Sequence, residues 1–225
     1  MIGRTLILGG GETDYSFAET YLEGQKFDSV VCADSGLAAA KKLGLDVSFF
    51  MGDFDSVDKE VLAEYMEIGQ TCEEGTKFIK YPEEKDYTDL HLVLEWVTGQ
   101  QPSEIVILGA TGGRLDHFIA NVNILMLPMQ NNIPAYIIDP YNKLCLINSM
   151  YRIKRSSLWG KYISLCPLTE KVTGVCLSGM KYPLTNAVLK IGESIAVSNE
   201  MAKDAEEAVI SLDKGILVVI ESKDA

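Results

Sequence analysis

Acidic side chains follow several short apolar runs in the first half of the sequence. Asp34, Asp53, Asp55 and Asp89 each stand shortly after such a run. Carboxylates that converge repel one another by roughly 3 kcal/mol at about 5 Å in an effective dielectric of about 20. A divalent cation turns this repulsion into attraction, and carboxylate oxygens are ligands that Mg²⁺ prefers. The four residues therefore favour magnesium-dependent chemistry on a phosphate-bearing substrate.

Structural roles compete with this interpretation at each acidic position. Side chains alternate along an extended backbone, so Asp53 and Asp55 would point the same way, but as turn residues they would splay into solvent. Asp34 is placed to cap a following helix. Asp86 can cap the next predicted helix, and Asp89 in its first turn suits the positive end of the helix dipole. A helix cap explains one of these two carboxylates, Asp86 or Asp89, but it does not require both.

A glycine-rich loop that ends in an arginine lies farther along the chain. Gly112 and Gly113 precede Arg114, and Asp116 follows at the start of an amphipathic segment. A glycine loop, a helix N-terminus and a guanidinium group together form a cradle for phosphate. Such loops also serve as plain tight turns between a strand and a helix.

A second glycine run, at 9–11, suggests an NAD oxidoreductase of the Rossmann type as a rival, because Asp34 follows about twenty residues later. Asp14 breaks the G-x-G-x-x-G fingerprint, and the surplus of carboxylates also counts against this rival. The sequence contains no G-x-x-x-x-G-K-[ST] loop, which excludes an ordinary Walker-type nucleotide site.

Composition and charge restrict the class of protein. The 225 residues are 47% hydrophobic and 23% charged, which is typical of a folded globular chain. A net charge of −12 has the wrong sign for a nucleic-acid surface, so an anionic ligand needs a local cation or a few placed basic groups. Five cysteines without C-x-x-C spacing indicate thiols in a reducing compartment. With no export signal or membrane span recognised, we expect a cytoplasmic protein.

Apolar periodicity predicts an α/β region over residues 1–142. Strands are expected over 4–8, 29–33, 48–51, 77–81, 104–108 and 135–138, and helices over 16–22, 36–43, 58–68, 88–97 and 115–127. The apolar faces of the last two helices are Leu90, Val93, Leu94 and Val97, and Leu115, Phe118, Ile119, Val122 and Leu125. This alternation favours a Rossmann-like parallel sheet covered by helices. In such sheets ligands bind beyond the carboxyl ends of the strands, where the acidic residues and the arginine loop are expected to meet.

Residues 143–225 have a different pattern, in which strand follows strand. Strands are expected over 143–148, 161–166, 172–177, 187–191, 194–198, 206–211 and 215–221. Their spacing favours a small antiparallel sandwich or barrel. The fold class is therefore an N-terminal α/β domain followed by a C-terminal all-β domain.

Six motifs, taken in order, resemble the motif series of the thiamine pyrophosphokinase family. They are Ala33-Asp34-Ser35-Gly36, Gly52-Asp53-Phe54-Asp55-Ser56, Asp86-Tyr87-Thr88-Asp89, Gly112-Gly113-Arg114-Leu115-Asp116-His117, Gly179-Met180-Lys181-Tyr182-Pro183-Leu184 and Val197-Ser198-Asn199-Glu200. The resemblance spans nearly the whole chain. One departure is Leu37-Ala38, where some members of the family carry an asparagine.

The resemblance implies an enzyme that transfers a diphosphate group from ATP to the hydroxyl of thiamine, giving thiamine diphosphate and AMP. It implies that 1–142 is a catalytic domain that binds MgATP, that 143–225 is a thiamine-binding β-sandwich, and that a homodimer holds thiamine between its subunits. The implied catalytic residues are Asp34, Asp53, Asp55 and Asp89, of which the last three bind Mg²⁺. The implied ATP-binding residues are Gly112, Gly113, Arg114 and Asp116, and the implied thiamine-binding residues are Tyr182, Ser198 and Asn199.

Two structural or non-enzymatic alternatives stay open at this point. Tyr182 by itself would be interpreted as a core or surface aromatic of a strand, and only its motif suggests that it stacks on thiamine. The chain could also be a non-catalytic binding module that keeps the nucleotide fold and senses a ligand through its β domain. Loss of a metal carboxylate would favour such a module, and none is lost.

Overall fold

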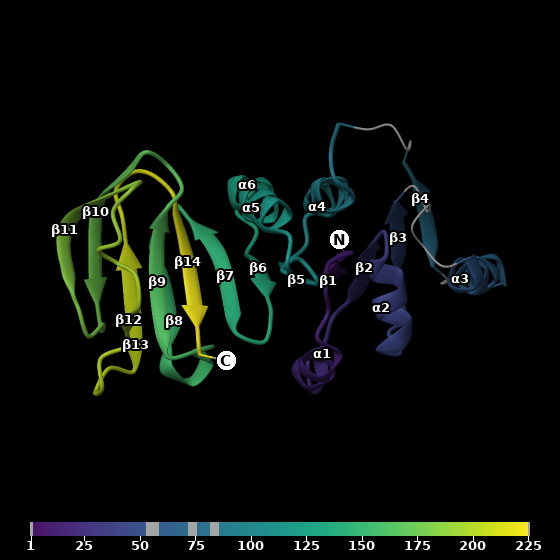
Figure 1. Cartoon of the computed structure of the whole chain (residues 1–225), viewed down its shortest axis with the longest axis horizontal. Helices are drawn as coiled ribbons and strands as arrows, with labels where there is room; N and C mark the ends of the chain where they lie inside the picture. The colour runs from purple at the N-terminus through teal and green to yellow at the C-terminus, as the bar shows by residue number, and fades with distance from the viewer. Residues whose placement is uncertain (1, 53–58, 72–75, 82–85, 225) are drawn as a thin grey trace. The chain divides into compact units, whose positions relative to one another are not determined.

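The structure is a computed structural model that describes residues 2–52, 59–71, 76–81 and 86–224. Asp53 and Asp55, which the sequence places at the metal site, lie outside the described residues. The chain divides into two compact units, Met1–Pro140 and Tyr141–Ala225. The first unit is an α/β layer structure and the second is built from antiparallel strands (Figure 1).

The first unit is organised around a parallel sheet with the strand order β6-β5-β1-β2-β3-β4. The strands are β1 (Arg4–Leu8), β2 (Ser29–Ala33), β3 (Phe49–Gly52), β4 (Lys77–Lys80), β5 (Glu104–Leu108) and β6 (Ala135–Ile138). The helices are α1 (Tyr15–Leu22), α2 (Gly36–Lys42), α3 (Lys59–Thr71), α4 (Asp89–Gly99), α5 (Leu115–Ile124) and α6 (Met126–Gln130). Helices α1 and α2 lie on one side of the strands and α4 to α6 on the other (Figure 1). The predicted parallel α/β domain is confirmed.

The core of this unit lies where apolar strands meet apolar helix faces. Central strands β1 and β5 are covered on both faces, and their Leu6, Ile7, Ile105 and Ile107 have no exposed surface. The predicted apolar face of α4 is buried as well, with exposed fractions of 8% or less for all four of its residues. Burial of such side chains contributes about 1.5 to 3 kcal/mol each, which holds the strand ends in fixed positions.

The helix predicted over 115–127 differs from the structure in two ways. It divides into α5 and α6, because the ring of Pro128 would clash with the carbonyl of Ile124, where α5 ends. The predicted apolar face is also wrong in part, since Leu115 and Ile119 are 69% and 60% exposed. The helical period places these two with the buried Val122, but the first turns of α5 extend beyond the core.

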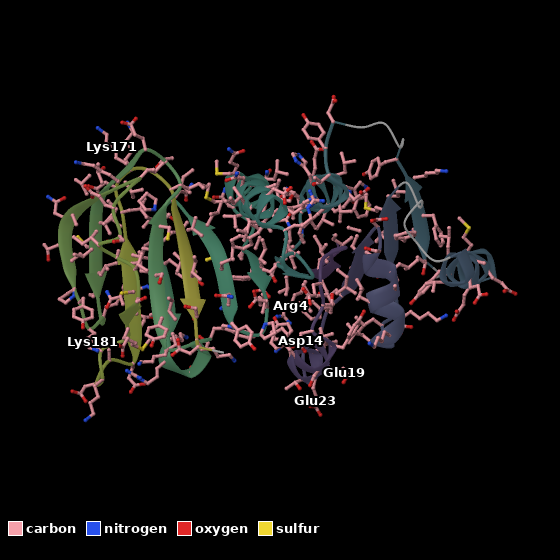
Figure 2. All side chains as sticks on the ribbon, in the orientation of Figure 1. Arg4, Asp14, Glu19, Glu23, Lys171 and Lys181 are labelled. Atoms are coloured by element: carbon pink, nitrogen blue, oxygen red, sulfur yellow. The ribbon has the colours of Figure 1, made fainter. Side chains whose placement is uncertain are left out.

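Two of the helix starts correct the capping roles that the sequence suggested. Thr88, not Asp86, caps α4, and its Oγ1 accepts a hydrogen bond from the backbone N–H of His91 at 3.3 Å. Asp34 does not cap α2, whose N-cap is Ser35, and Asp34 instead adopts a left-handed backbone conformation with φ 48°. Asp14 does cap its helix, α1, and Figure 2 labels it there.

The second unit is a sandwich of antiparallel sheets with the strand orders β12-β9-β14-β7 and β11-β10-β13-β8. The strands are β7 (Asn142–Ile147), β8 (Tyr151–Lys154), β9 (Tyr162–Pro167), β10 (Lys171–Ser178), β11 (Leu184–Lys190), β12 (Asn199–Glu200), β13 (Glu207–Ser211) and β14 (Leu217–Ser222). Lys171 and Lys181 mark opposite ends of this unit (Figure 2). The all-β prediction is confirmed, and the sandwich rather than the barrel is present.

One strand prediction in this unit is wrong, and one strand was not predicted. Residues 195–198 form turns, because the N–H of Val197 bonds to Ser194 and that of Ser198 to the Ser164 hydroxyl. The strand at this edge is the short β12 that follows. Strand β8 was not predicted, since Ile153 is its only buried residue and its sequence is mostly polar.

Candidate active site

A cavity of about 390 Å³ lies in the first unit, where loops leave the carboxyl ends of the parallel strands. Its walls come from the segments after β1, β2 and β5 and from the first turns of α4 and α5. It is lined by Gly10, Gly11, Glu12, Ala33, Asp34, Thr88, Asp89, Leu90, Gly109, Ala110, Thr111, Gly112, Gly113, Arg114, His117, Phe118 and Asn121. The structure thus brings Asp34, Asp89 and Arg114, expected to meet at this edge of the sheet, to one cavity.

The glycine run after β1 serves contact between two loops. The N–H of Gly11 donates to the carbonyl of Gly109 at 2.8 Å, and the N–H of Gly9 donates to Leu108 at the same distance. A Cβ atom on Gly9 or Gly11 would lie 2.6 or 2.5 Å from the Gly109 oxygen. These glycines therefore let the β1 and β5 loops approach closely and form one side of the cavity.

Asp34 is held at the cavity by β3, the strand next to β2. Its backbone N–H donates to the carbonyl of Met51 in β3 at 3.1 Å. A Cβ on Gly52 would lie 3.4 Å from the Asp34 Cα, so the end of β3 packs directly against it. The left-handed conformation of Asp34 is uncommon for a residue with a side chain and is characteristic of functional positions.

Asp89 enters the cavity from the first turn of α4. The cap by Thr88 fixes where this helix begins, and the buried face of α4 fixes its rotation. Asp89 therefore faces the cavity at a helix N-terminus, where the partial positive charge of the helix stabilises a carboxylate.

Arg114 precedes α5 and pairs with Asp116. The guanidinium donates to Asp116 through Nη2 at 2.6 Å and through Nε at 3.3 Å. These hydrogen bonds, followed by the backbone N–H of His117, lower the pKa of Asp116 to about 2. The loop before Arg114 bends at Gly109 and Gly112, with φ of 68° and 150°. Arg114 lines the cavity, whereas Asp116 orients the guanidinium from outside the lining.

Several cavity residues were not among the predicted site residues. They are Glu12, Thr88, Thr111, His117, Phe118 and Asn121. Asn121 is 8% exposed, and its Nδ2 donates to the carbonyl of Ala110 at 2.9 Å, which ties α5 to the glycine loop. The sequence contains one signal for two of these residues. His117 and Asn121 are four residues apart, so they lie on the same face of the helix that follows Arg114.

The carboxylates of the cavity are chemically suited to Mg²⁺. Magnesium is commonly bound by one or two carboxylates together with substrate phosphates and water, and the carboxylate residues Glu12, Asp34 and Asp89 line this cavity. Within the described part of the chain, no group of three or more His, Cys, Asp or Glu side chains could hold a metal by itself.

The predicted thiamine residues lie together in the second unit. Tyr182 is 59% exposed, whereas Asn199 is 4% exposed and hydrogen-bonds to the backbone of Tyr182. Ser198 is exposed, with φ 57°. Lys181 forms an ion pair with Glu200 at 3.0 Å, and its Nζ lies 5.4 Å from the centre of the Tyr182 ring. This end of the sandwich therefore presents an aromatic ring, a hydroxyl and a charged pair.

Across the described residues, none of the helices is both long and apolar enough to cross a membrane.

Comparison with known proteins matches each of the two units to a domain of one protein family. The domain family described as thiamin pyrophosphokinase, catalytic domain, matches residues 21–137, and thiamin pyrophosphokinase, vitamin B1 binding domain, matches 150–217. Thiamine pyrophosphokinase of Bacillus subtilis is 32% identical over 213 residues, which cover 94% of this chain and 92% of that protein.

Solved structures are similar over the whole chain. The crystal structure of the Bacillus subtilis thiamine pyrophosphokinase has a TM-score of 0.84 at 29% identity, covering 99% of this chain and 100% of that one. The enzyme of Geobacillus thermodenitrificans has a TM-score of 0.81 at 29% identity, covering 99% and 98%. These matches extend through both the α/β unit and the sandwich, and the chain belongs to the thiamine pyrophosphokinase family.

Proposed function

We propose that this protein transfers a diphosphate group from ATP to the hydroxyl of thiamine, producing thiamine diphosphate and AMP. The observation that carries the proposal is the cavity in which Asp34, Asp89 and Arg114 meet at the carboxyl edge of the sheet. A catalytic-domain match alone would leave the reacting groups unspecified. The shared cavity supports a role in the reaction for these three side chains.

In this proposal the triphosphate of ATP lies against the loop from Gly109 to Arg114. Gly112 and Gly113 carry no side chain, so backbone N–H groups can approach the phosphates, and the N-terminus of α5 adds its positive end. Arg114 binds phosphate oxygens with its planar guanidinium, and Asp116 holds that group ready. This provides local positive charge in a protein whose net charge is −12.

The proposed acidic residues are Asp34, Asp53, Asp55 and Asp89, with Mg²⁺ bound by the last three. A bound Mg²⁺ would neutralise charge on the phosphate oxygens and hold them in line for displacement. Asp34 and Asp89 support this proposal because both line the cavity, and Gly52, which precedes Asp53, packs against Asp34. Their carboxylates would help to hold Mg²⁺ against the polyphosphate.

Thiamine is proposed to bind at the part of the second unit that Tyr182, Ser198 and Asn199 form, where Tyr182 and Ser198 are exposed and Asn199 is buried behind Tyr182. Its thiazolium ring is a permanent cation, and a cation over an aromatic face is stabilised by about 0.5 to 2 kcal/mol. The exposed ring of Tyr182 supports this role. Phosphoryl-type transfer then depends on orientation of the thiamine hydroxyl toward the β-phosphorus, which binding of both substrates provides.

We further propose a cytoplasmic homodimer with thiamine held between subunits and no role for nucleic acid or membrane. Exposed apolar side chains of the second unit support an interface, and they include Tyr182, Val188, Ile191, Ile195 and Val197. Cys32, Cys145, Cys166 and Cys176 are free thiols, as expected in a reducing compartment.

The proposal is tested by incubating the purified protein with MgATP and thiamine and separating the products. We expect thiamine diphosphate and AMP in equal amounts, and neither product when thiamine or Mg²⁺ is omitted. Formation of ADP with thiamine monophosphate would show transfer of one phosphoryl group and contradict the diphosphate step. Absence of any thiamine-dependent ATP cleavage would contradict the proposed enzyme.

A further inference from the structure

We propose that Asn199 acts as a positioning residue for Tyr182 and does not itself contact thiamine. The inference concerns the thiamine site and rests on the function proposed above. It separates two neighbouring residues that the sequence motif groups together. Ser198 is exposed and can meet a ligand, whereas Asn199 is buried behind the loop that carries Tyr182.

The side chain of Asn199 clamps the backbone of Tyr182 from both sides. Its Oδ1 accepts a hydrogen bond from the N–H of Tyr182 at 3.0 Å, and its Nδ2 donates to the carbonyl of Tyr182 at 2.8 Å. The same Oδ1 also accepts from the N–H of Glu200 at 2.9 Å. The other Nδ2 proton points to the sulfur of Met180, a weak acceptor 3.5 Å away.

These contacts use every hydrogen-bonding position of the amide. An asparagine side chain has two lone pairs on its oxygen and two protons on its nitrogen, and all four are engaged here. The orientation of the amide follows from its partners, because two backbone N–H groups face the oxygen and a carbonyl faces the nitrogen. A ligand could bond to Asn199 only by breaking the clamp.

The clamp completes a short pairing between two loops. The N–H of Lys181 donates to the carbonyl of Glu200 at 2.8 Å, and the N–H of Ala202 donates to that of Gly179 at 2.9 Å. Asn199 itself lies in β12 and pairs with Ile163 of β9, so its backbone is anchored in the sheet. The side chain thereby extends the order of the sheet to residue 182, which lies outside any strand.

The exposed ring of Tyr182 explains why such a clamp is useful. With 59% of the residue exposed, packing contributes little to its direction, so the backbone that carries the ring must be fixed by other means. A ring that stacks on a cation must present its face at a defined position, and freezing the backbone before binding lowers the entropic cost. Asn199 is therefore expected to affect thiamine through Tyr182 alone.

The clamp is measured first by amide hydrogen exchange on the ligand-free protein. In the parent the N–H of Tyr182 should be protected, and Asn199→Ala should raise its exchange rate at least about tenfold. Asn186→Asp is the matched control, because Asn186 is an exposed asparagine of the same unit with φ 50°, and protection should survive there. Unchanged protection of Tyr182 in Asn199→Ala would overturn the inference.

A double-mutant cycle then separates positioning from direct contact. Asn199→Asp keeps the accepting oxygen, but it places a second oxygen against the carbonyl of Tyr182. We expect the KM for thiamine to rise about tenfold while the KM for MgATP changes less than about twofold. In a Tyr182→Ala background the same substitution should change the KM for thiamine less than about twofold, because the clamp then has no ring to position.

Additive effects in the two backgrounds would show that Asn199 contacts thiamine directly, and would overturn the inference while leaving the proposed function intact. A parent protein without activity would instead contradict the proposed function. In that case the exchange measurement still decides whether Asn199 holds the Tyr182 loop. Asn186→Asp should leave both KM values unchanged and controls for the added charge.

Discussion

Arg114 and Asp116 illustrate how a residue pair at the cavity can be both exposed and ordered. Their side chains are 72% and 66% exposed, so the attraction between them adds little to folding stability. Their contribution lies in geometry, since the carboxylate fixes the plane of the guanidinium. A phosphate bound there would meet donors already in position.

The planar geometry of Arg114 leads to the first prediction. Arg114→Lys keeps the charge but loses the paired donors, so we expect kcat/KM for MgATP to fall at least about tenfold. In Arg114→Ala, kcat/KM for MgATP should fall further, because the positive charge is lost as well. Steady-state kinetics with varied MgATP measures both. A lysine variant that matches the parent while the alanine variant fails would show that charge alone matters.

Asp116 gives a prediction with a defined pH dependence. Its pKa is lowered from 3.8 to about 2 in the folded protein, so the unfolded chain binds the proton more readily. The pair therefore stabilises the fold fully above pH 4, and this stabilisation is lost as the pH falls toward 2. Urea unfolding of the parent and of Asp116→Asn should show a small difference at pH 7 that disappears at low pH. A difference that does not depend on pH would contradict this origin.

At the scale of single elements, the loops and helix starts around the cavity are fixed by local features. The β1 and β5 loops touch through glycine backbone, and α4 begins at the Thr88 cap. Each feature decides where a cavity residue stands, although none of these groups needs to touch a substrate. Substitutions in these loops and at this cap are therefore expected to lower the stability of the fold, and to affect activity only through that loss.

Two glycines of the cavity loops, Gly11 and Gly113, should differ in how much substitution by alanine lowers the stability of the protein. Gly11→Ala would place a Cβ 2.5 Å from the carbonyl oxygen of Gly109, so the two loops must separate, at a cost of about 1 to 3 kcal/mol. At Gly113 a Cβ meets nothing within 4 Å, so Gly113→Ala should keep the stability of the parent. Urea unfolding midpoints compare the two variants. Equal stability of both would contradict the close approach of the loops.

The cap of α4 is Thr88 and not Asp86, which the sequence suggested, so the two residues should respond differently to substitution by alanine. Thr88→Ala should lower the free energy of unfolding by about 1 kcal/mol, because the His91 N–H loses its partner. Asp86→Ala removes an exposed side chain that does not cap the helix, and should change stability by less than about 0.5 kcal/mol. Chemical denaturation at neutral pH measures both. The reverse order would restore Asp86 as the cap.

At the scale of the whole molecule, the proposed activity needs groups from both units. The acidic cavity belongs to the first unit, and the clamped Tyr182 belongs to the second. In the proposed homodimer, each complete site combines a cavity from one subunit with a tyrosine from its partner. This arrangement is open to a direct genetic test.

Mixing two impaired variants should raise the activity. Tyr182→Ala and Asp55→Asn subunits, exchanged into a heterodimer, leave one of two shared sites with both residues intact. We expect activity above that of either variant alone, approaching about half of the parent per heterodimer. Subunit exchange is verified separately by differently tagged chains. No recovery after verified exchange, or a fully active monomer, would contradict the shared site.

The sequence by itself determined the class of each half of the chain and most of the strands and helices. Apolar periodicity is a local property, and it correctly places β1, β2, β5 and β6, together with the buried face of α4. The order of the motifs carried the family assignment, which the matches of both domains confirm.

Only the tertiary structure decided how individual side chains are used. Periodicity placed Leu115 and Ile119 in the core, but exposure depends on how far α5 extends past the sheet. Likewise the motif grouped Ser198 with Asn199, although one faces solvent and the other binds backbone seventeen positions away. A hydrogen bond between residues distant along the chain has no local sequence signal, because it exists only after folding brings the two loops together.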